Sequence, residues 1–177
     1  MRKMTTFAAL TTAAMLMAFP PVVQKELYAE NDFRGKAAPK IEVETWLGGA
    51  NPELKGKTVL LDFWATWCGP CRATIPELNK WQAEFKDDLV IIGLSNEKPE
   101  VVKTFMETTA MKYSIAIDTQ ARTSKTVGVK GIPHAMVITP DGVVRWQGFP
   151  GLEADPLTTE KLKSIIAEGK ALARGGN

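Results

Sequence analysis

Two cysteines three residues apart, Cys68 and Cys71, constrain the fold of this chain more than any other feature. They follow a continuous apolar run from Thr58 to Trp64, which is typical of a strand buried on both faces. Apolar residues then recur at the spacing of an amphipathic helix: Ile75, Leu78, Trp81 and Phe85. The sequence therefore predicts a cysteine pair at a strand-to-helix junction.

The rest of the chain continues this alternation of buried strands and helices. Strands are predicted at Leu89–Leu94, Tyr113–Ile117, Met136–Thr139 and Val143–Gln147, with a first short strand or turn at Ile41–Leu47. Helices are predicted at Pro99–Met106, Ala121–Val127 and Leu157–Leu172. Pro140-Asp141-Gly142 is a hairpin signal between the last two strands. This order predicts one α/β domain, a central mixed sheet flanked by helices on both faces.

The cysteine pair is interpreted as a redox centre. A purely structural bridge across so short a loop would add only about 2 kcal/mol by restricting the unfolded chain. Half of a zinc site is the other alternative, but the chain has only two cysteines and one histidine to supply ligands. The pair is thus predicted to work as a redox-active disulfide with no other cofactor and no metal.

Cys68 is the predicted nucleophile. A cysteine at a helix N-terminus has its thiolate stabilised by free backbone N–H groups and the helix dipole, so its pKa falls below about 8.5. Cys71, one turn further, is expected to be buried and to resolve the mixed disulfide. Pro70 suits the first helical turn and fixes the relative position of the two sulfurs.

The N-terminus has the pattern of an export signal. Arg2 and Lys3 precede an apolar run from Phe7 to Phe19, and Leu27-Tyr28-Ala29 is an acceptable cleavage site. We therefore expect a signal peptide at residues 1–29, a single domain at residues 30–177 and a periplasmic location. An uncleaved membrane anchor is the alternative.

The balance of basic and acidic residues argues against nucleic acid as a partner. Without residues 1–29 the chain has 19 basic and 19 acidic residues, so no basic surface for nucleic acid is expected. Apolar content of 45% and charged content of 24% are those of an ordinary globular domain.

The segment from Val59 to Cys71 resembles the active-site segment of thioredoxins almost residue for residue. Gly131-Ile132-Pro133 is similar to the loop where thioredoxin-like proteins place a cis proline beside the cysteines. The 61 residues between Cys71 and Pro133 leave room for an extra helix and strand, as in the TlpA, ResA and DsbE (CcmG) group of exported thiol-disulfide oxidoreductases. The resemblance covers about Gly35 to Leu172.

The resemblance implies a thioredoxin-like fold and a set of client-binding residues. Pro133 is expected to be cis, and the Ile132 backbone is expected to pair with an extended client peptide. The full client-binding set is Trp67, Gly69, Pro70, Ile132 and Pro133. Partners would be protein thiols and disulfides together with a membrane donor of electrons, and a monomer is expected.

Asp62 is the one acidic residue within the strand before the cysteines. It occupies the buried-acid position of cytoplasmic thioredoxins, and burial should raise its pKa, which suits a general acid/base for Cys71. The alternative is a structural acid. Thr74 stands where many relatives of the exported group carry a glutamate. His134 and Trp64 are open to either a functional or a packing role.

The predicted function is reduction of disulfides in specific exported clients, such as the haem-binding thiols of apocytochrome c or a copper-site assembly protein. Three alternatives remain at this point: a disulfide oxidase or isomerase, a thiol peroxidase, and a non-catalytic binding module. A peroxidase of the peroxiredoxin type would need threonine three residues before its reactive cysteine, and that position is Ala65.

Overall fold

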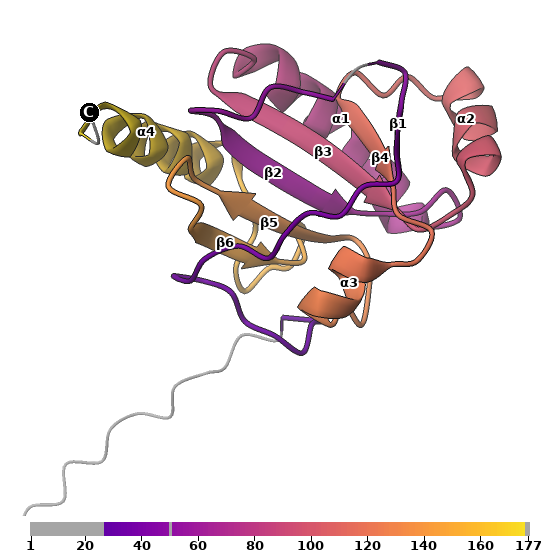
Figure 1. Ribbon diagram of the computed structural model, residues 1–177, viewed down its shortest axis with the longest axis horizontal. Coiled ribbons are helices and arrows are strands. Elements are labelled where there is room, and N and C mark those ends of the chain that lie inside the picture. The colour runs from indigo at the N-terminus through magenta and orange to yellow at the C-terminus, as the bar shows by residue number, and fades with distance from the viewer. Residues whose placement is uncertain (1–26, 50, 176–177) are drawn as a thin grey trace, which may run out of the picture.

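The computed structural model describes residues 27–49 and 51–175 of the chain. These residues form a six-stranded sheet in the order β1-β4-β3-β2-β5-β6 (Figure 1). The strands are β1 (Thr45–Leu47), β2 (Thr58–Phe63), β3 (Leu89–Ser95), β4 (Ser114–Ile117), β5 (His134–Ile138) and β6 (Val144–Gly148). The pairs β2–β3 and β3–β4 are parallel and the others antiparallel, so the predicted mixed sheet is confirmed.

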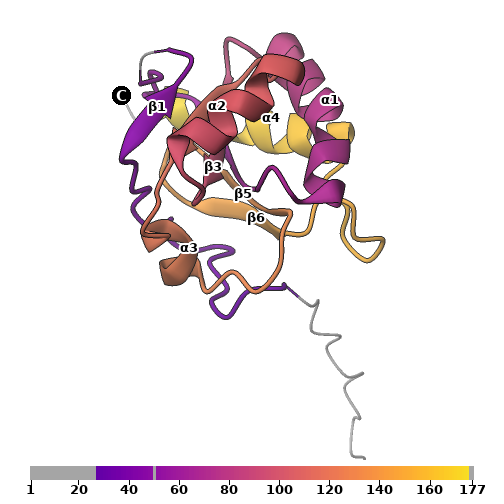
Figure 2. The same cartoon turned by 90° about the vertical axis from the view of Figure 1, so that its right-hand side faces the viewer.

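Helices cover both faces of the sheet, as predicted. The helices are α1 (Gly69–Glu84), α2 (Pro99–Thr108), α3 (Arg122–Val127) and α4 (Thr159–Gly175). Figure 2 shows α1, α2 and α4 on one side of the sheet and α3 on the other. The buried core is accordingly divided into two clusters, one under α1, α2 and α4 and one facing α3 and the N-terminal segment.

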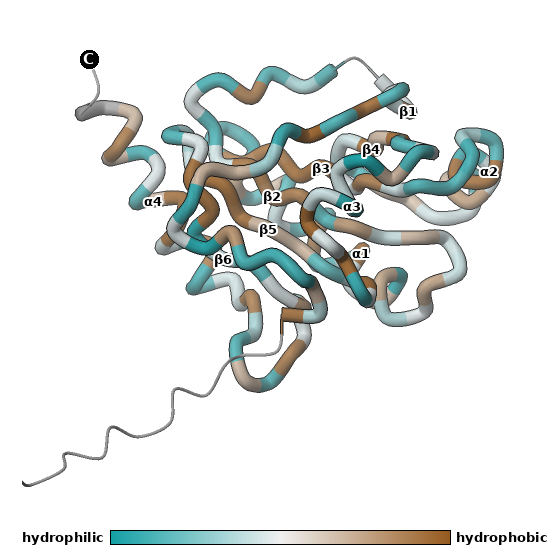
Figure 3. The backbone as a smooth tube through the Cα atoms, turned by 60° about the horizontal axis from the view of Figure 1, so that its bottom comes forward, coloured by the Kyte–Doolittle hydropathy of each residue, from teal (hydrophilic) through white to brown (hydrophobic). Residues whose placement is uncertain are grey.

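The two central strands form the most apolar part of the molecule. Every residue of β2 and of β3 is buried, and Figure 3 shows both strands as predominantly hydrophobic. Coverage of both faces explains why these strands have continuous apolar runs rather than an alternating pattern. Asp62 is the one charged residue in either strand, and its side chain is 2% exposed.

Helix α1 begins where the sequence predicts, and α4 begins two residues after the predicted Leu157. Helix α1 starts at Gly69, with Cys68 as its N-cap and Pro70 in the first turn. Helix α4 begins at Thr159 because the Thr158 hydroxyl accepts a hydrogen bond from the Lys161 N–H at 3.2 Å.

The segment between residue 27 and β1 crosses the sheet face that α1, α2 and α4 leave open (Figure 1). Near its start it pairs with the chain that precedes Gly131. Ala29 forms an antiparallel bridge with Val129, and the Lys130 N–H donates to the Tyr28 carbonyl oxygen at 2.8 Å. The N-terminal segment therefore supports the loop that contains Pro133.

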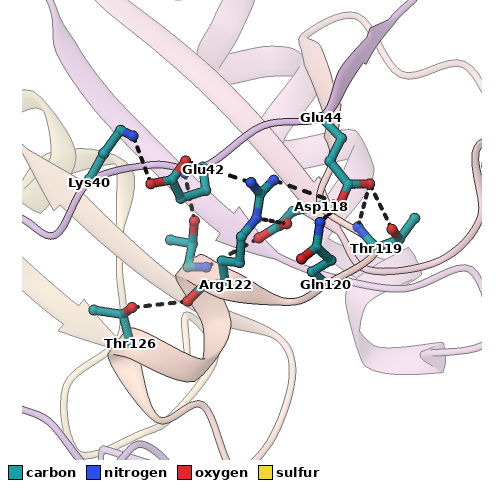
Figure 4. Close-up of polar contacts among 9 residues, drawn as sticks. Lys40, Glu42, Glu44, Asp118, Thr119, Gln120, Arg122 and Thr126 are labelled. Atoms are coloured by element: carbon teal, nitrogen blue, oxygen red, sulfur yellow. Dashed lines mark hydrogen bonds and ion pairs between the residues drawn. The ribbon is translucent and has the colours of Figure 1, made fainter.

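Near its other end the same segment is held by Arg122 of α3 (Figure 4). The Nε of Arg122 donates to Asp118 at 2.7 Å, and its two terminal nitrogens lie 3.9 Å from a Glu42 oxygen and 3.7 Å from a Glu44 oxygen. One arginine thus joins the segment before β1 to the connection between β4 and α3.

Most of the predicted signal peptide, including Arg2, Lys3 and Phe7–Phe19, lies outside the described residues. Leu27, Tyr28 and Ala29 lie inside them. Within residues 27–49 and 51–175, none of the helices has the length and apolarity needed to cross a membrane.

Candidate active site

Cys68 and Cys71 form a disulfide at the N-terminus of α1, with their Cα atoms 5.3 Å apart. The Cys71 backbone N–H donates to the Cys68 Sγ at 3.2 Å, so a sulfur acts as the capping acceptor of the helix. Such an N–H group stabilises negative charge on this sulfur once the bond is reduced. The residues are only 3% and 1% exposed, so even the predicted nucleophile is nearly covered.

The surface next to the disulfide is dominated by Trp67, which is 73% exposed. Gly69 follows on the other side of Cys68, and a Cβ atom at this position would meet no atom within 4 Å. Pro70 is also exposed and stands in the first turn of α1. Cys68 therefore has an exposed indole on one side and an open position on the other.

The Gly131-Ile132-Pro133 loop lies directly against the disulfide. The Ile132 carbonyl oxygen is 3.7 Å from the Cys68 Sγ, although the two residues are 64 positions apart in the chain. The Ile132–Pro133 peptide bond is cis, which confirms that expectation. The structure thus brings together the predicted cysteines, Trp67 and the proline loop.

A cleft of about 400 Å³ lies between Trp67 and this loop. Its lining combines apolar and polar side chains, among them Phe63, Trp67, Asn96, Asp118, Lys130 and Ile132. The cleft is therefore neither purely apolar nor purely polar.

Asp62 lies on the same side of the sheet as the disulfide, in register with Gly93 of β3 and Ala135 of β5. No described residue donates a hydrogen bond to its carboxyl group, and burial raises the pKa of Asp62 to about 7. A carboxyl group with this pKa is able to accept and return a proton near neutral pH.

A cavity of about 410 Å³ reaches Asp62 from between α1 and the chain before α4. Thr74 lines it together with Glu77, Trp81, Pro150 and Glu160. Thr74 also donates its hydroxyl to the Cys71 carbonyl oxygen at 2.8 Å. Thr74 therefore faces the same cavity as the buried acid.

Two residues that the sequence left open are buried, His134 on the far face of the sheet and Trp64 at the wall of the cleft beside Trp67. His134 is fully buried beside Phe63 and Gln147, on the sheet face opposite the disulfide, and burial lowers the pKa of His134 to about 4. Trp64 is buried against Phe105, with ring centroids 5.6 Å apart. Both side chains are packed in the interior.

One polar contact of this region has no signal in the sequence. The Glu97 carboxylate, in the connection between β3 and α2, accepts hydrogen bonds from both the backbone N–H and the hydroxyl of Thr66, each at 2.7 Å. The described residues contain no group of three or more His, Cys, Asp or Glu side chains that could hold a metal ion.

Comparison with known proteins agrees with this geometry. The AhpC/TSA family pattern matches residues 34–147. Thiol-disulfide oxidoreductase ResA of Bacillus thuringiensis subsp. konkukian is 38% identical over 136 residues, which cover 74% of this chain and 78% of that protein. The chain belongs to the AhpC/TSA family.

Further relatives of this AhpC/TSA family member support a thiol-disulfide oxidoreductase activity. Thioredoxin-like protein YneN of Bacillus subtilis is 34% identical over 117 residues, covering 63% of this chain and 68% of that protein. The crystal structure of a putative thiol:disulfide interchange protein DsbE from Chlorobium tepidum matches with a TM-score of 0.57 and 31% identity, covering 66% and 82% of the two chains. This family member has a thioredoxin-like fold and is a thiol-disulfide oxidoreductase that acts on protein substrates.

Proposed function

We propose that this oxidoreductase works as a reductase of specific exported proteins, with Cys68 attacking and Cys71 resolving. The observation that carries the proposal is the position of the Cys68 sulfur as the N-cap acceptor of α1, 3.2 Å from the Cys71 nitrogen. This position stabilises a Cys68 thiolate and leaves Cys71 inside the first turn.

The first step is attack on the client. In the reduced protein the Cys68 thiolate attacks one sulfur of a client disulfide, and an S–S bond forms between Cys68 and the client. The other client sulfur leaves as a thiolate. The exposed Trp67, with Gly69, Pro70, Ile132 and Pro133, forms the proposed client-binding surface around the reacting sulfur.

The second step resolves the mixed disulfide. The Asp62 carboxylate accepts the proton of the Cys71 thiol, and the resulting thiolate attacks the Cys68 Sγ. The Cys68–Cys71 bond forms while the remaining client sulfur leaves as a thiolate. The client has then gained two electrons, and the protein is in the oxidised state of this structure. Two observations support Asp62 in this role, its pKa of about 7 and the cavity it shares with Thr74 of α1.

Continued turnover needs a source of electrons outside the cytoplasm. A membrane protein with a reducing dithiol would restore the Cys68 and Cys71 thiols by the reverse exchange. The export signal proposed at residues 1–29 would deliver the protein to the periplasm, either cleaved or as a membrane-anchored form. Clients of this kind are the haem-binding thiols of apocytochrome c or a copper-site assembly protein.

The direction of the reaction is tested by the reduction potential of the Cys68–Cys71 pair, measured in glutathione redox buffers. We expect a value closer to the roughly −270 mV of thioredoxin than to the roughly −120 mV of strong disulfide oxidants. A potential near that of the strong oxidants would reject the reductase function and leave an oxidase or isomerase.

A further inference from the structure

We infer that Glu97 is a positioning residue that holds the nucleophile Cys68 through Thr66. The inference rests on the proposed role of Cys68 as the attacking sulfur. Glu97 lies 29 residues after Cys68 in the sequence and belongs to a different loop, so its effect on the site depends entirely on the fold.

The loop from β2 to α1 is held at both of its ends. This loop is tied at its start by the Trp64 N–H, which donates to the Leu94 carbonyl oxygen at 3.3 Å. It closes as a turn at its end, where the Cys68 N–H donates to the Ala65 carbonyl oxygen at 3.1 Å. Thr66 lies between these two points and donates both its backbone N–H and its hydroxyl to Glu97.

The acceptor, Glu97, is held in place by its own hydrogen bonds. Glu97 is itself fixed to the end of the sheet by Ser95, the last residue of β3, which is 1% exposed. The Ser95 hydroxyl donates to the Glu97 carboxylate at 3.2 Å and also accepts the Glu97 N–H at 3.2 Å. The Glu97 carboxylate therefore accepts three hydrogen bonds, two from Thr66 and one from Ser95. It ties Thr66 to the end of strand β3. Hydrogen bonds to an ionised acceptor are stronger than those between neutral groups.

The contact between Thr66 and Glu97 lies two residues before the reacting sulfur in the chain. Thr66 is followed directly by Trp67 and Cys68, whose sulfur must face the Cys71 N–H for its thiolate to be stabilised. If Thr66 is released, the turn that presents Cys68 loses its link to the end of β3 through Glu97 and keeps the backbone bond from Trp64 to Leu94 at the start of the loop. The sulfur then spends less time within reach of the helix N-terminus, and its thiolate becomes less stable.

The hydrogen bonds of Glu97 and its negative charge should have opposite effects on the stability of the Cys68 thiolate. The two effects can therefore be separated by experiment. Loss of the negative charge of Glu97 would by itself favour the Cys68 thiolate. Loss of the hydrogen bonds would disfavour it. Thr66→Val removes the hydroxyl donor without changing any charge, whereas Glu97→Gln removes the charge and one of the acceptor oxygens.

The experiment measures how fast Cys68 of the reduced full-length protein reacts with iodoacetamide across pH, together with thermal unfolding. We expect both Thr66→Val and Glu97→Gln to move the midpoint of the alkylation profile to higher pH and to slow reaction at pH 7 several-fold. Thr66→Ser, which keeps a hydroxyl donor, should restore the original profile. Thr108→Val is the matched control, because its hydroxyl bonds only within α2, to the Phe105 carbonyl oxygen.

Two results would overturn the inference. One is an unchanged profile in both variants, whatever happens to thermal stability, because Glu97 would then be only structural. The other is a lower midpoint in Glu97→Gln with no change in Thr66→Val, because Glu97 would then act by charge alone. Alkylation does not depend on the direction of the physiological reaction, so an oxidising reduction potential would reject the reductase proposal and leave this inference standing.

Discussion

Asp62 of β2 lies beside Gly93 of β3 in the parallel register, and the missing side chain of Gly93 leaves space for aromatic neighbours. A Cβ atom at position 93 would lie 2.9 Å from the Trp64 Nε1 and 3.1 Å from the Tyr113 Cε2. The glycine thus lets two aromatic rings close over the sheet next to the candidate proton acceptor. Burial, followed by the Asp62 charge, raises the pKa of Tyr113.

Gly93→Ala should therefore destabilise the protein by about 1–3 kcal/mol, because the methyl group overpacks a rigid part of the core. Urea unfolding of the oxidised protein measures this loss. Gly49→Ala is the control, since a Cβ atom at position 49 would meet nothing within 4 Å. Equal stability of the two variants would show that the aromatic rings move aside freely.

Asp62→Asn should stabilise the protein above neutral pH. The folded pKa of about 7 exceeds the ordinary value of 3.8, so between these pH values the folded state binds more protons than the unfolded state. Stability of the unmodified protein therefore falls as pH rises through this window, and the variant escapes that loss. The gain should be small near pH 3.5 and reach at most about 4 kcal/mol at pH 8. A gain that is the same at both pH values would contradict burial of an ionisable carboxyl.

Much of this arrangement could be predicted from the sequence because its signals are local. The apolar run of β2, the helical spacing after Cys71 and the hairpin turn each depend on neighbouring residues. Glu97 could not be found in this way, because its partner Thr66 lies 31 residues away and both look like ordinary polar loop residues. The role of Gly93 could not be predicted from the sequence either. Only the fold shows that the rings of Trp64 and Tyr113 occupy the space that a side chain at this position would need.

Cys71→Ser should trap client proteins as mixed disulfides with Cys68, because no second thiol is available to release them. Cys68→Ser should trap none and should lose insulin reduction altogether. Non-reducing gels of the exported fraction, followed by identification of the linked proteins, make the comparison. Equal capture by the two variants would mean that Cys68 is not the attacking sulfur.

Thr74→Glu should move the proton chemistry of Asp62 to higher pH. The new carboxylate would enter the cavity that Thr74 shares with Asp62, and a like charge raises the pKa of the buried acid above about 7. The pH profile of mixed-disulfide resolution should shift upward with it. Thr74→Gln loses the same hydroxyl contact and has a similar size without charge, so its profile should match that of threonine. A shift shared by both variants would point to packing instead.

The contact between the Ile132 carbonyl oxygen and the Cys68 sulfur also concerns the order of synthesis. The two cysteines are synthesised about sixty residues before the loop that lies against Cys68. Tyr28 is synthesised still longer before Lys130, to which it is hydrogen-bonded in the folded protein. During that interval the Cys68 sulfur lacks the neighbour that this loop provides in the folded protein. The site around Cys68 is therefore complete only after residues 131–133 have been synthesised and have folded against the start of α1.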